Sequence, residues 1–332
     1  MQGKDEMESR ELNQIKSQLL WRKNKIQGVI SGHIVPMHLV NLLKEVDSAL
    51  ERIDNGTYGM CVVCNSPIER NRLLVDPLLK VCLDHLTTNQ QKELEEDLVV
   101  ANSIQKAMLP KNDLQLKGYE IFYYYDAAGI VSGDYCDIID TGENKDSLFL
   151  IIGDVSGKGI AASMLMTHLR AMFQSLVPLD LSLSQLMARA GRLLCESTSS
   201  SHYATMIAAK TMNDGKVEIC NAGHCLPLYI GNYGVKKIES NGMPIGIFCE
   251  SEYSLTSLNL DKGEMILLYS DGLTEASADD EMFGIERLEK FANDHKELSP
   301  KSFIDQLLVE LNNFLGTTPK SDDLTIMSIK RK

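Results

Sequence analysis

The sequence predicts an α+β protein, because apolar runs of strand length alternate with amphipathic stretches of helical period in its C-terminal part. Three of these runs have the length of buried strands: 148–152, 265–269 and 324–329. Helices are expected at 160–176 and at 303–315, the second introduced by Ser299 and Pro300 at its N-cap and first position. The pattern alone does not choose between a sandwich and an open sheet.

The N-terminal part is predicted to begin with two helices, at 11–30 and at 37–53. A turn at 31–36, marked by Gly32 and Pro36, separates them. No residue pattern in these helices indicates chemistry. We therefore expect a helical hairpin at the start of the chain.

Three cysteines and a histidine follow as two close pairs. Cys61 and Cys64 enclose two residues, and after seventeen further positions Cys82 and His85 enclose two more. Such pairs are typical of a structural zinc site, in which four protein ligands leave no open position for catalysis. The alternative, unrelated buried thiols beside a surface histidine, is disfavoured by the spacing. We predict one structural Zn²⁺ here.

The segment around this cluster, ALERIDNGTYGMCVVCNSPIERNRLLVDPLLKVCLDH at 49–85, resembles the zinc-finger module of DksA/TraR-type transcription factors. His85 stands where many members carry a fourth cysteine, and histidine is an ordinary zinc ligand. The resemblance implies an acidic tip that reaches into RNA polymerase, yet the turn at 31–36 contains no acidic residue. We therefore interpret the module as a sensor or as a docking platform for a regulatory protein.

A linker helix is predicted at 91–110. Five of its residues recur at 4-3-4-3 spacing: Leu94, Leu98, Ala101, Gln105 and Met108. Pro110 ends the pattern. The spacing fits a short heptad seam between two copies of the chain, and it fits equally an amphipathic helix packed on the chain's own C-terminal domain.

Four acidic motifs carry the strongest indication of chemistry: SGDYCD (132–137), GDVSGKG (153–159), SDGLTE (270–275) and SDDLT (321–325). Three of them lie at the edge of a predicted strand, so that strand ends can bring their carboxylates together. Clustered carboxylates repel unless a divalent cation neutralises them, and oxygen ligands select Mg²⁺ or Mn²⁺ over zinc. Two such ions about 3.5–4 Å apart can clamp a phosphoryl group and activate a water. The motifs therefore predict a phosphate-ester hydrolase.

Other interpretations of single motifs are weaker. An Asp beside Gly after a strand is often only a turn residue, but four such motifs together favour a site. GDVSGKG is not a P-loop. A P-loop has four residues between its first Gly and its Gly-Lys pair and then a Ser or Thr, whereas here three residues separate them and Gly159 follows. Lys158 could contact a substrate phosphate or be a solvated loop lysine. His224 could be a general acid, although fixing a turn is the favoured role, and neither residue is placed in the catalytic set.

Residues 95–330 resemble a PPM-type serine/threonine phosphatase of the SpoIIE/RsbU group. Beyond the four acidic motifs, the resemblance rests on four segments in the family's order: DLVVANSIQKAMLP (97–110), NAGHCLP (221–227), GMPIGI (242–247) and FGIERL (283–288). It implies a β-sandwich flanked by helices and metal-dependent hydrolysis of phosphoserine or phosphothreonine. The predicted domains are thus 1–90 (hairpin and zinc finger), 91–110 (linker helix) and 111–332 (phosphatase).

The resemblance also implies a ligand set for two Mn²⁺ or Mg²⁺ ions. Asp154 would bridge both ions, with the backbone carbonyl of Val155 beside it. Asp271 and Asp322 would complete the two sites, and with Asp154 they form the expected catalytic set. Asp134 would support a metal or bind one through water.

The match to the family is ambiguous at one position and departs from the family at another. Asp322 and Asp323 precede the same predicted strand, so either could be the direct ligand while the other holds it in place; Asp322 is favoured. Cys136 stands where the family more often carries an aromatic residue, a change that removes no expected ligand.

The resemblance further implies partners. SpoIIE/RsbU-type enzymes act on phosphorylated STAS-type anti-anti-sigma proteins in partner-switching circuits, and their linker helix commonly transmits a signal, which favours a homodimer through 91–110. The alternative function is a catalytically weak or inactive phosphatase-fold binding protein. The four intact motifs favour the enzyme, because clustered carboxylates destabilise a fold that no longer needs a metal.

Composition excludes several classes. The chain has 332 residues, 44% of them hydrophobic, and a net charge of −13, which argues against nucleic-acid binding. Its apolar runs are too short to span a membrane, so a cytoplasmic protein is expected. Five cysteines outside the zinc motif are expected as buried thiols in a reducing compartment rather than disulfides: Cys136, Cys195, Cys220, Cys225 and Cys249.

Overall fold

The computed structural model covers residues 1–332 and describes 9–30, 37–85, 88–142, 147–198, 202–239, 242–278 and 281–332. The predicted turn at 31–36 lies outside the described residues. The chain divides into two compact units, Met1–Asp97 and Leu98–Lys332.

The smaller unit begins with the two expected helices, α1 (Ser9–Ile30) and α2 (Met37–Asp54). They pack through a small apolar cluster: Ile15, Leu19, Ile26, Val46, Ala49 and Leu50. An ion pair of 2.6 Å between Lys16 and Asp54 also joins the helices. The short helices α3 (Arg70–Val75) and η1 (Leu83–His85) follow, and α4 (Thr88–Met108) runs from this unit into the larger one.

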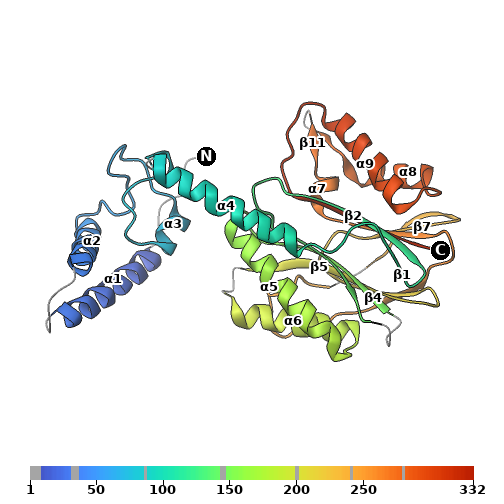
Figure 1. Cartoon of the computed structure of the whole chain (residues 1–332), viewed down its shortest axis with the longest axis horizontal. Helices are drawn as coiled ribbons and strands as arrows, with labels where there is room; N and C mark the ends of the chain where they lie inside the picture. The colour runs from blue at the N-terminus through green and yellow to red at the C-terminus, as the bar shows by residue number, and fades with distance from the viewer. Residues whose placement is uncertain are drawn as a thin grey trace. The chain divides into compact units, whose positions relative to one another are not determined.

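The larger unit contains two antiparallel sheets (Figure 1). The first has six strands in the order β1 (Leu114–Leu116), β2 (Tyr119–Asp126), β13 (Leu324–Arg331), β10 (Met265–Tyr269), β7 (Leu228–Gly231) and β8 (Gly234–Lys237). The second has five strands in the order β3 (Asp134–Asp140), β4 (Ser147–Val155), β5 (Ala204–Met212), β6 (Lys216–Ala222) and β9 (Thr256–Asn259). A separate two-stranded ribbon pairs β11 (Ser277–Ala278) with β12 (Glu281–Met282). The three predicted strands are therefore β4, β10 and β13.

The two sheets bury a common apolar layer. It contains Ile121 and Met327 from the six-stranded sheet and Leu150 and Ile152 from the five-stranded sheet. Side chains alternate between the two faces of a strand, so each sheet also presents a second apolar face to helices. The β-sandwich that the family resemblance implied, and that periodicity left open, is confirmed.

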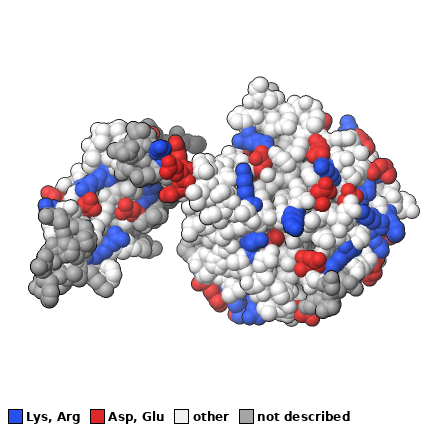
Figure 2. Space-filling view, in the orientation of Figure 1, with Lys and Arg blue, Asp and Glu red and all other residues white. Residues whose placement is uncertain are grey.

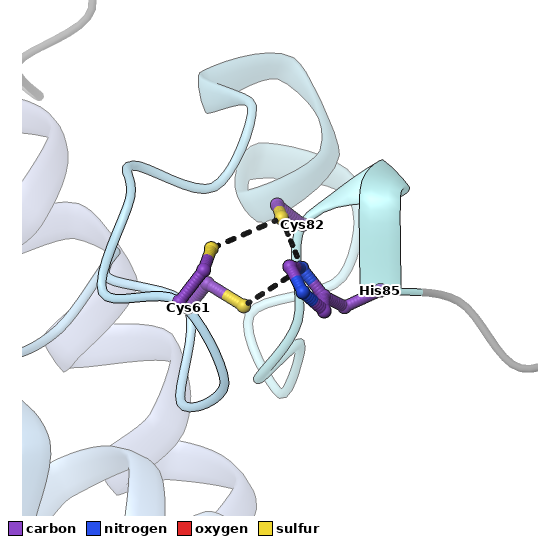
Figure 3. Close-up of side chains that lie close together, drawn as sticks. Cys61, Cys82 and His85 are labelled. Carbon is purple, nitrogen blue, oxygen red and sulfur yellow. Dashed lines mark hydrogen bonds between the residues drawn. The ribbon is translucent and has the colours of Figure 1, made fainter.

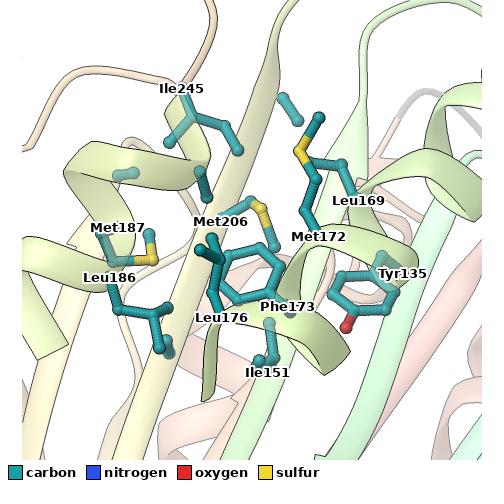
Figure 4. Packing of buried hydrophobic residues seen from close by; sticks show 14 of the residues in the cluster. Tyr135, Ile151, Leu169, Met172, Phe173, Leu176, Leu186, Met187, Met206 and Ile245 are labelled. Atoms are coloured by element: carbon teal, nitrogen blue, oxygen red, sulfur yellow. The ribbon is translucent and has the colours of Figure 1, made fainter. Parts of the chain in front are cut away.

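Helices cover both outer faces of the sandwich (Figure 1). α5 (Ile160–Leu176), η2 (Val177–Leu179) and α6 (Leu183–Ser197) pack on the five-stranded sheet, where Phe173 stacks on Tyr135 at 5.9 Å between ring centroids (Figure 4). α8 (Gly284–Asp294) and α9 (Pro300–Leu315) cover the six-stranded sheet, with Phe291 and Phe303 in edge-to-face contact. α7 (Asp271–Thr274) is a single turn after β10. Ser299 caps α9 by accepting from the Ser302 amide at 3.2 Å, as predicted.

The cysteine prediction is wrong at two positions. Cys195, on α6, and Cys249 form a disulfide with a Cα–Cα distance of 5.2 Å. They are 54 positions apart, and no local pattern shows that α6 meets the loop after Gly246. Cys136 and Cys220 are buried free thiols, as expected, and Cys225 is a half-buried free thiol.

Two further expectations concern the surface. None of the described helices is long and apolar enough to cross a membrane. On the face of the described residues shown in Figure 2, Lys and Arg are interspersed with Asp and Glu rather than gathered into one basic area.

The linker helix packs on the chain's own core at one predicted seam position. Gln105 is only 6% exposed and bonds to Ser132 within the larger unit. The large apolar side chains that α4 exposes within the larger unit are Val99, Val100 and Ile104, which do not share the face of Gln105. The interpretation of a helix packed on its own domain is therefore correct at Gln105.

Candidate active site

The four acidic motifs converge where the two sheets meet. Asp134 begins β3 and lies directly opposite Asp154, near the end of β4, in the antiparallel register. Asp271 starts α7 immediately after β10, and Asp322 precedes β13. Since β10 and β13 are antiparallel neighbours, the end of one lies beside the start of the other.

Ser270 and Thr325 hold the ends of β10 and β13 together. The Ser270 amide donates to the Thr325 carbonyl at 2.9 Å, and the Thr325 amide donates to the Ser270 hydroxyl at 2.9 Å. The backbones approach so closely that a Cβ on Gly272 would lie 1.9 Å from the Asp323 carbonyl oxygen. Glycine is therefore required in the SDGLTE motif, because any side chain would push Asp271 away from Asp322.

The electrostatics of Asp154 show that the carboxylates act on one another. Burial, and then the charges of Asp271, Asp322 and Asp323, raise the pKa of Asp154 to about 7. Burial also raises the pKa of Asp271, with further contributions from Glu275 and Asp322. Buried carboxylates that lie near other carboxylates are destabilised when they carry negative charge. A bound divalent cation would offset that charge. The donor set, all oxygen and rich in Asp, fits Mg²⁺ or Mn²⁺.

Asp134 is the most deeply buried of these residues, at 1% exposed. Its Oδ2 accepts a hydrogen bond from the Thr325 hydroxyl, and burial raises its pKa well above the usual range. The carbonyl of Val155 lies nearby, since a Cβ added to Gly133 would be 3.3 Å from it. Both predicted supporting groups thus lie at the same end of the sandwich as Asp154.

Asp322 and Asp323 have different surroundings. Asp323 accepts hydrogen bonds from the Ala128 amide at 2.8 Å, the Ser132 hydroxyl at 2.7 Å and the Gly133 amide at 2.8 Å. Its carboxylate is therefore occupied in holding the loop before β3. Asp322 accepts from the Asp323 amide at 3.0 Å and pairs with Lys158 at 3.0 Å. This contrast favours Asp322 as the carboxylate available to a metal ion.

Lys158 and His224, the two residues left outside the catalytic set, have distinct environments. The hydrogen bond from Lys158 to Asp322 raises the lysine pKa, and the lysine charge in turn lowers that of Asp154. His224 is buried, and the Asn221 side chain bonds both its amide and its carbonyl, at 2.7 Å and 3.0 Å. Burial lowers the pKa of His224 to about 4, so the ring is neutral near pH 7 and is a poor general acid. The turn at 221–224 is held by the Asn221 side chain, and the His224 ring lies 2.9 Å from the Thr205 hydroxyl through its Nδ1.

The cysteine and histidine ligands form a second candidate site, in the smaller unit. The ligand atoms of Cys61, Cys64, Cys82 and His85 all lie within 4.8 Å of one another (Figure 3). Cys64 and Cys82 sulfurs are 3.7 Å apart, and His85 Nδ1 is 3.2 Å from the Cys82 sulfur. Two sulfurs at tetrahedral zinc are expected about 3.8 Å apart for Zn–S bonds of about 2.3 Å. The donor set and its spacing therefore fit Zn²⁺.

The two candidate sites differ in how far their ligands have converged. Within the part of the chain that the structure describes, the cysteine–histidine group is the one set of three or more candidate ligands that is already this close. The aspartates share one end of the sandwich and influence one another's pKa, but they are less tightly gathered.

Comparison with known proteins agrees with this geometry. Residues 144–332 match the family model described as stage II sporulation protein E (SpoIIE). The chain belongs to the SpoIIE family. It is a PPM-type phosphatase, and the predicted enzyme class is confirmed.

Individual relatives of this SpoIIE-family phosphatase are distant in sequence. Phosphoserine phosphatase RsbU of Bacillus subtilis (strain 168) is 27% identical over 251 residues, which cover 73% of this chain and 72% of RsbU. Phosphoserine phosphatase RsbP of the same organism is 26% identical over 241 residues, covering 71% of this chain and 57% of RsbP. The SiaA-PP2C domain of Pseudomonas aeruginosa superposes with a TM-score of 0.64 at 19% identity, over 73% of this chain and 98% of that domain. The last match shows the PP2C fold.

Sequence reasoning missed three residues that shape this site in the SpoIIE-family phosphatase. Thr325 and Ser270 lie inside the predicted motifs but had no role assigned, and Gln105 was assigned only to a helical seam, either between two chains or on the chain's own domain. The signal for the first two was present, because a hydroxyl beside a motif Asp can bond it. The role of Gln105 depends on a contact with the distant Ser132, which only the fold reveals.

Proposed function

We propose that this phosphatase removes phosphate from phosphoserine or phosphothreonine in a protein, using two Mn²⁺ or Mg²⁺ ions. Asp154, the Val155 carbonyl, Asp271 and Asp322 would hold the ions, with Asp134 in support. The observation that carries the proposal is the pKa of Asp154, raised to about 7 by burial and by carboxylates from two other motifs. A site that gathers this much negative charge favours the binding of divalent cations.

The residues of the chain have separable roles in this proposal. When bound, the ions would supply Lewis-acid activation of the phosphoryl group and of a water nucleophile. Lys158 stands at the exposed edge, paired with Asp322, where its charge can meet an incoming phosphate. Thr325 keeps Asp134 in place, and Asp323 keeps the loop at 128–133 in place.

We infer a protein substrate of the STAS anti-anti-sigma class, acting in a partner-switching circuit. Support comes from RsbU and RsbP, which are named phosphoserine phosphatases, and from the SpoIIE/RsbU resemblance. Metal coordination of phosphate discriminates little between peptides, so specificity must come from the substrate's own surface. Phosphate release from phosphorylated STAS proteins should exceed release from an unrelated phosphopeptide. Equal rates on both would reject this substrate class while leaving the phosphatase activity intact.

For the N-terminal part we propose one structural Zn²⁺ on Cys61, Cys64, Cys82 and His85, in a regulatory module at 1–90. The convergence of the four ligands within 4.8 Å supports it. A linker at 91–110 would join this module to the phosphatase domain at 111–332. A homodimer through the linker would use the exposed Val99, Val100 and Ile104 rather than Gln105. Light scattering of wild-type protein and of a Val100→Glu variant tests the dimer, which the variant should dissociate.

The central experiment measures hydrolysis of an aryl phosphate by the purified chain with and without Mn²⁺. Activity should require the metal, and Asp154→Asn should lower turnover by about three orders of magnitude or more, because it removes a ligand's charge. Asp305→Asn, at an exposed position on α9, is the matched control and should retain full activity. Wild-type activity in Asp154→Asn, or equal activity in EDTA, would contradict the metal-dependent mechanism. Absence of hydrolysis by the wild type in Mn²⁺ would favour a non-catalytic binding protein.

A further inference from the structure

Gln105 is a buried amide whose hydrogen bonds go to one distant residue. Its Nε2 donates to the Ser132 carbonyl at 2.7 Å, and its Oε1 accepts from the Ser132 amide at 3.0 Å. The side chain is 6% exposed, and Ser132 is completely buried. This pair of bonds imitates the pairing of neighbouring strands and fixes both the position and the orientation of the Ser132 peptide.

Ser132 passes this constraint to two acidic motifs. Its hydroxyl donates to Asp323 Oδ2 at 2.7 Å and accepts from the Asp134 amide at 3.0 Å. The hydroxyl therefore contacts the motif that begins β3 and the motif that precedes β13. A single oxygen, held in place from α4, joins the two sheets beside the carboxylates.

The proposed metal ligands lie one step further along this network. The Asp323 amide donates to Asp322 Oδ1 at 3.0 Å, so the position of Asp323 orients the neighbouring carboxylate. On the other side, Asp134 lies opposite Asp154 in the β3–β4 register. Displacing Ser132 would therefore disturb both groups of oxygens. Residues that orient ligands in this way typically change metal affinity by about 10–100-fold when removed.

We infer that Gln105 is a positioning residue for the metal site: through Ser132 it sets the Asp134 and Asp322–Asp323 carboxylates for divalent cation binding. The inference rests on the proposed function. It assigns the two hydrogen bonds of a buried amide to metal affinity rather than to helix packing alone. A purely structural role predicts a change in stability with no change in affinity for Mn²⁺.

The test is direct titration of zinc-replete protein with Mn²⁺, in which electron paramagnetic resonance measures free Mn²⁺. Gln105→Met keeps the length and the apolar volume of the side chain but removes both hydrogen bonds. We expect Mn²⁺ binding about tenfold weaker than in the wild type, and aryl phosphate turnover restored to near the wild-type rate at saturating Mn²⁺. Lys106→Met, at the next and exposed position, is the matched control and should bind Mn²⁺ like the wild type.

A second variant keeps the inference falsifiable if Gln105→Met does not fold. Ser132→Ala removes only the hydroxyl of the network and should weaken Mn²⁺ binding by a similar factor. In the double variant the two losses should be less than additive, because both changes break one network. Wild-type Mn²⁺ affinity in either single variant that folds would overturn the inference, even if its melting temperature falls. Failure of the wild type itself to bind Mn²⁺ or to hydrolyse the aryl phosphate would instead refute the proposed function.

Discussion

The hydroxyl of Thr325 donates a hydrogen bond to the carboxylate of Asp134, although the two residues belong to different sheets. Asp134 starts β3 in the five-stranded sheet, and Thr325 lies near the start of β13 in the six-stranded sheet. Both side chains are buried. The candidate site therefore lies at a junction of the two sheets, and its geometry depends on how they pack.

Replacing Thr325 with Val should destabilise the protein and reduce its activity. The change removes the donor to a buried carboxylate at nearly constant volume, and an unsatisfied buried group costs about 1–3 kcal/mol. Urea unfolding measures the loss of stability. Thr211→Val is the matched control, because the Thr211 hydroxyl is buried and has no hydrogen-bond partner among the described residues. Equal stability in the two variants would show that the Thr325–Asp134 bond contributes nothing.

Asp322→Ala and Asp323→Ala should separate metal binding from loop anchoring. Asp323→Ala leaves three donors without their acceptor and should lower the free energy of unfolding by about 2–4 kcal/mol. Asp322 pairs mainly with the exposed Lys158, so its removal should change stability by less than about 1 kcal/mol while abolishing most metal-dependent turnover. Urea unfolding and Mn²⁺-dependent hydrolysis measure the two effects. If Asp323→Ala bound no metal yet unfolded like the wild type, Asp323 rather than Asp322 would be the metal ligand.

Protonation linked to His224 should lower the stability of the protein as the pH falls. Its folded-state pKa is lowered to about 4 by burial, against 6.5 for an exposed histidine. Below about pH 6.5 the unfolded chain takes up a proton that the folded chain does not, so stability is complete above this pH and is lost as pH falls towards 4. The contribution of His224 alone should be a loss of about 2 kcal/mol between about pH 7.5 and about pH 5. The raised pKa values of Asp134, Asp154 and Asp271 act in the opposite direction and are the same in a variant at position 224.

His224→Asn should reduce this slope, since its side chain does not titrate. Urea unfolding of both proteins at the two pH values provides the measurement. A slope unchanged by His224→Asn would mean that this histidine is protonated as readily when folded as when unfolded.

Zinc removal should affect the smaller unit alone. Purified protein should contain about one zinc ion per chain, and Cys64→Ser should lose it, because a closed site needs all four ligands. Elemental analysis measures the zinc, and limited proteolysis should then cut the segment at 55–85. Cys220→Ala, at a buried free thiol of the larger unit, should retain the metal. Zinc-free wild-type protein that resists proteolysis would contradict a structural role.

Much of the secondary structure could be predicted from local pattern. The helix at 160–176 and the strand at 265–269 match α5 and β10 at both ends, because apolar residues with one dominant period specify each of them. The cap of α9 at Ser299 followed from residue chemistry alone. The Cys195–Cys249 disulfide and the role of Gln105 could not be predicted, because each depends on two segments that meet only in the folded chain.

The sequence by itself determined which residues have the chemistry for a site: the Asp motifs, the Cys/His pairs and the order of segments typical of the SpoIIE family. These are properties of residue type and spacing, which do not depend on packing. Only the tertiary structure shows that Asp322 and Asp323 make different contacts, since adjacent residues of the same type have the same chemistry. It also placed Gln105 against Ser132 and Thr325 against Asp134. Such contacts arise because burial of the apolar faces brings two sheets and a helix together, and polar groups trapped between them must then find partners.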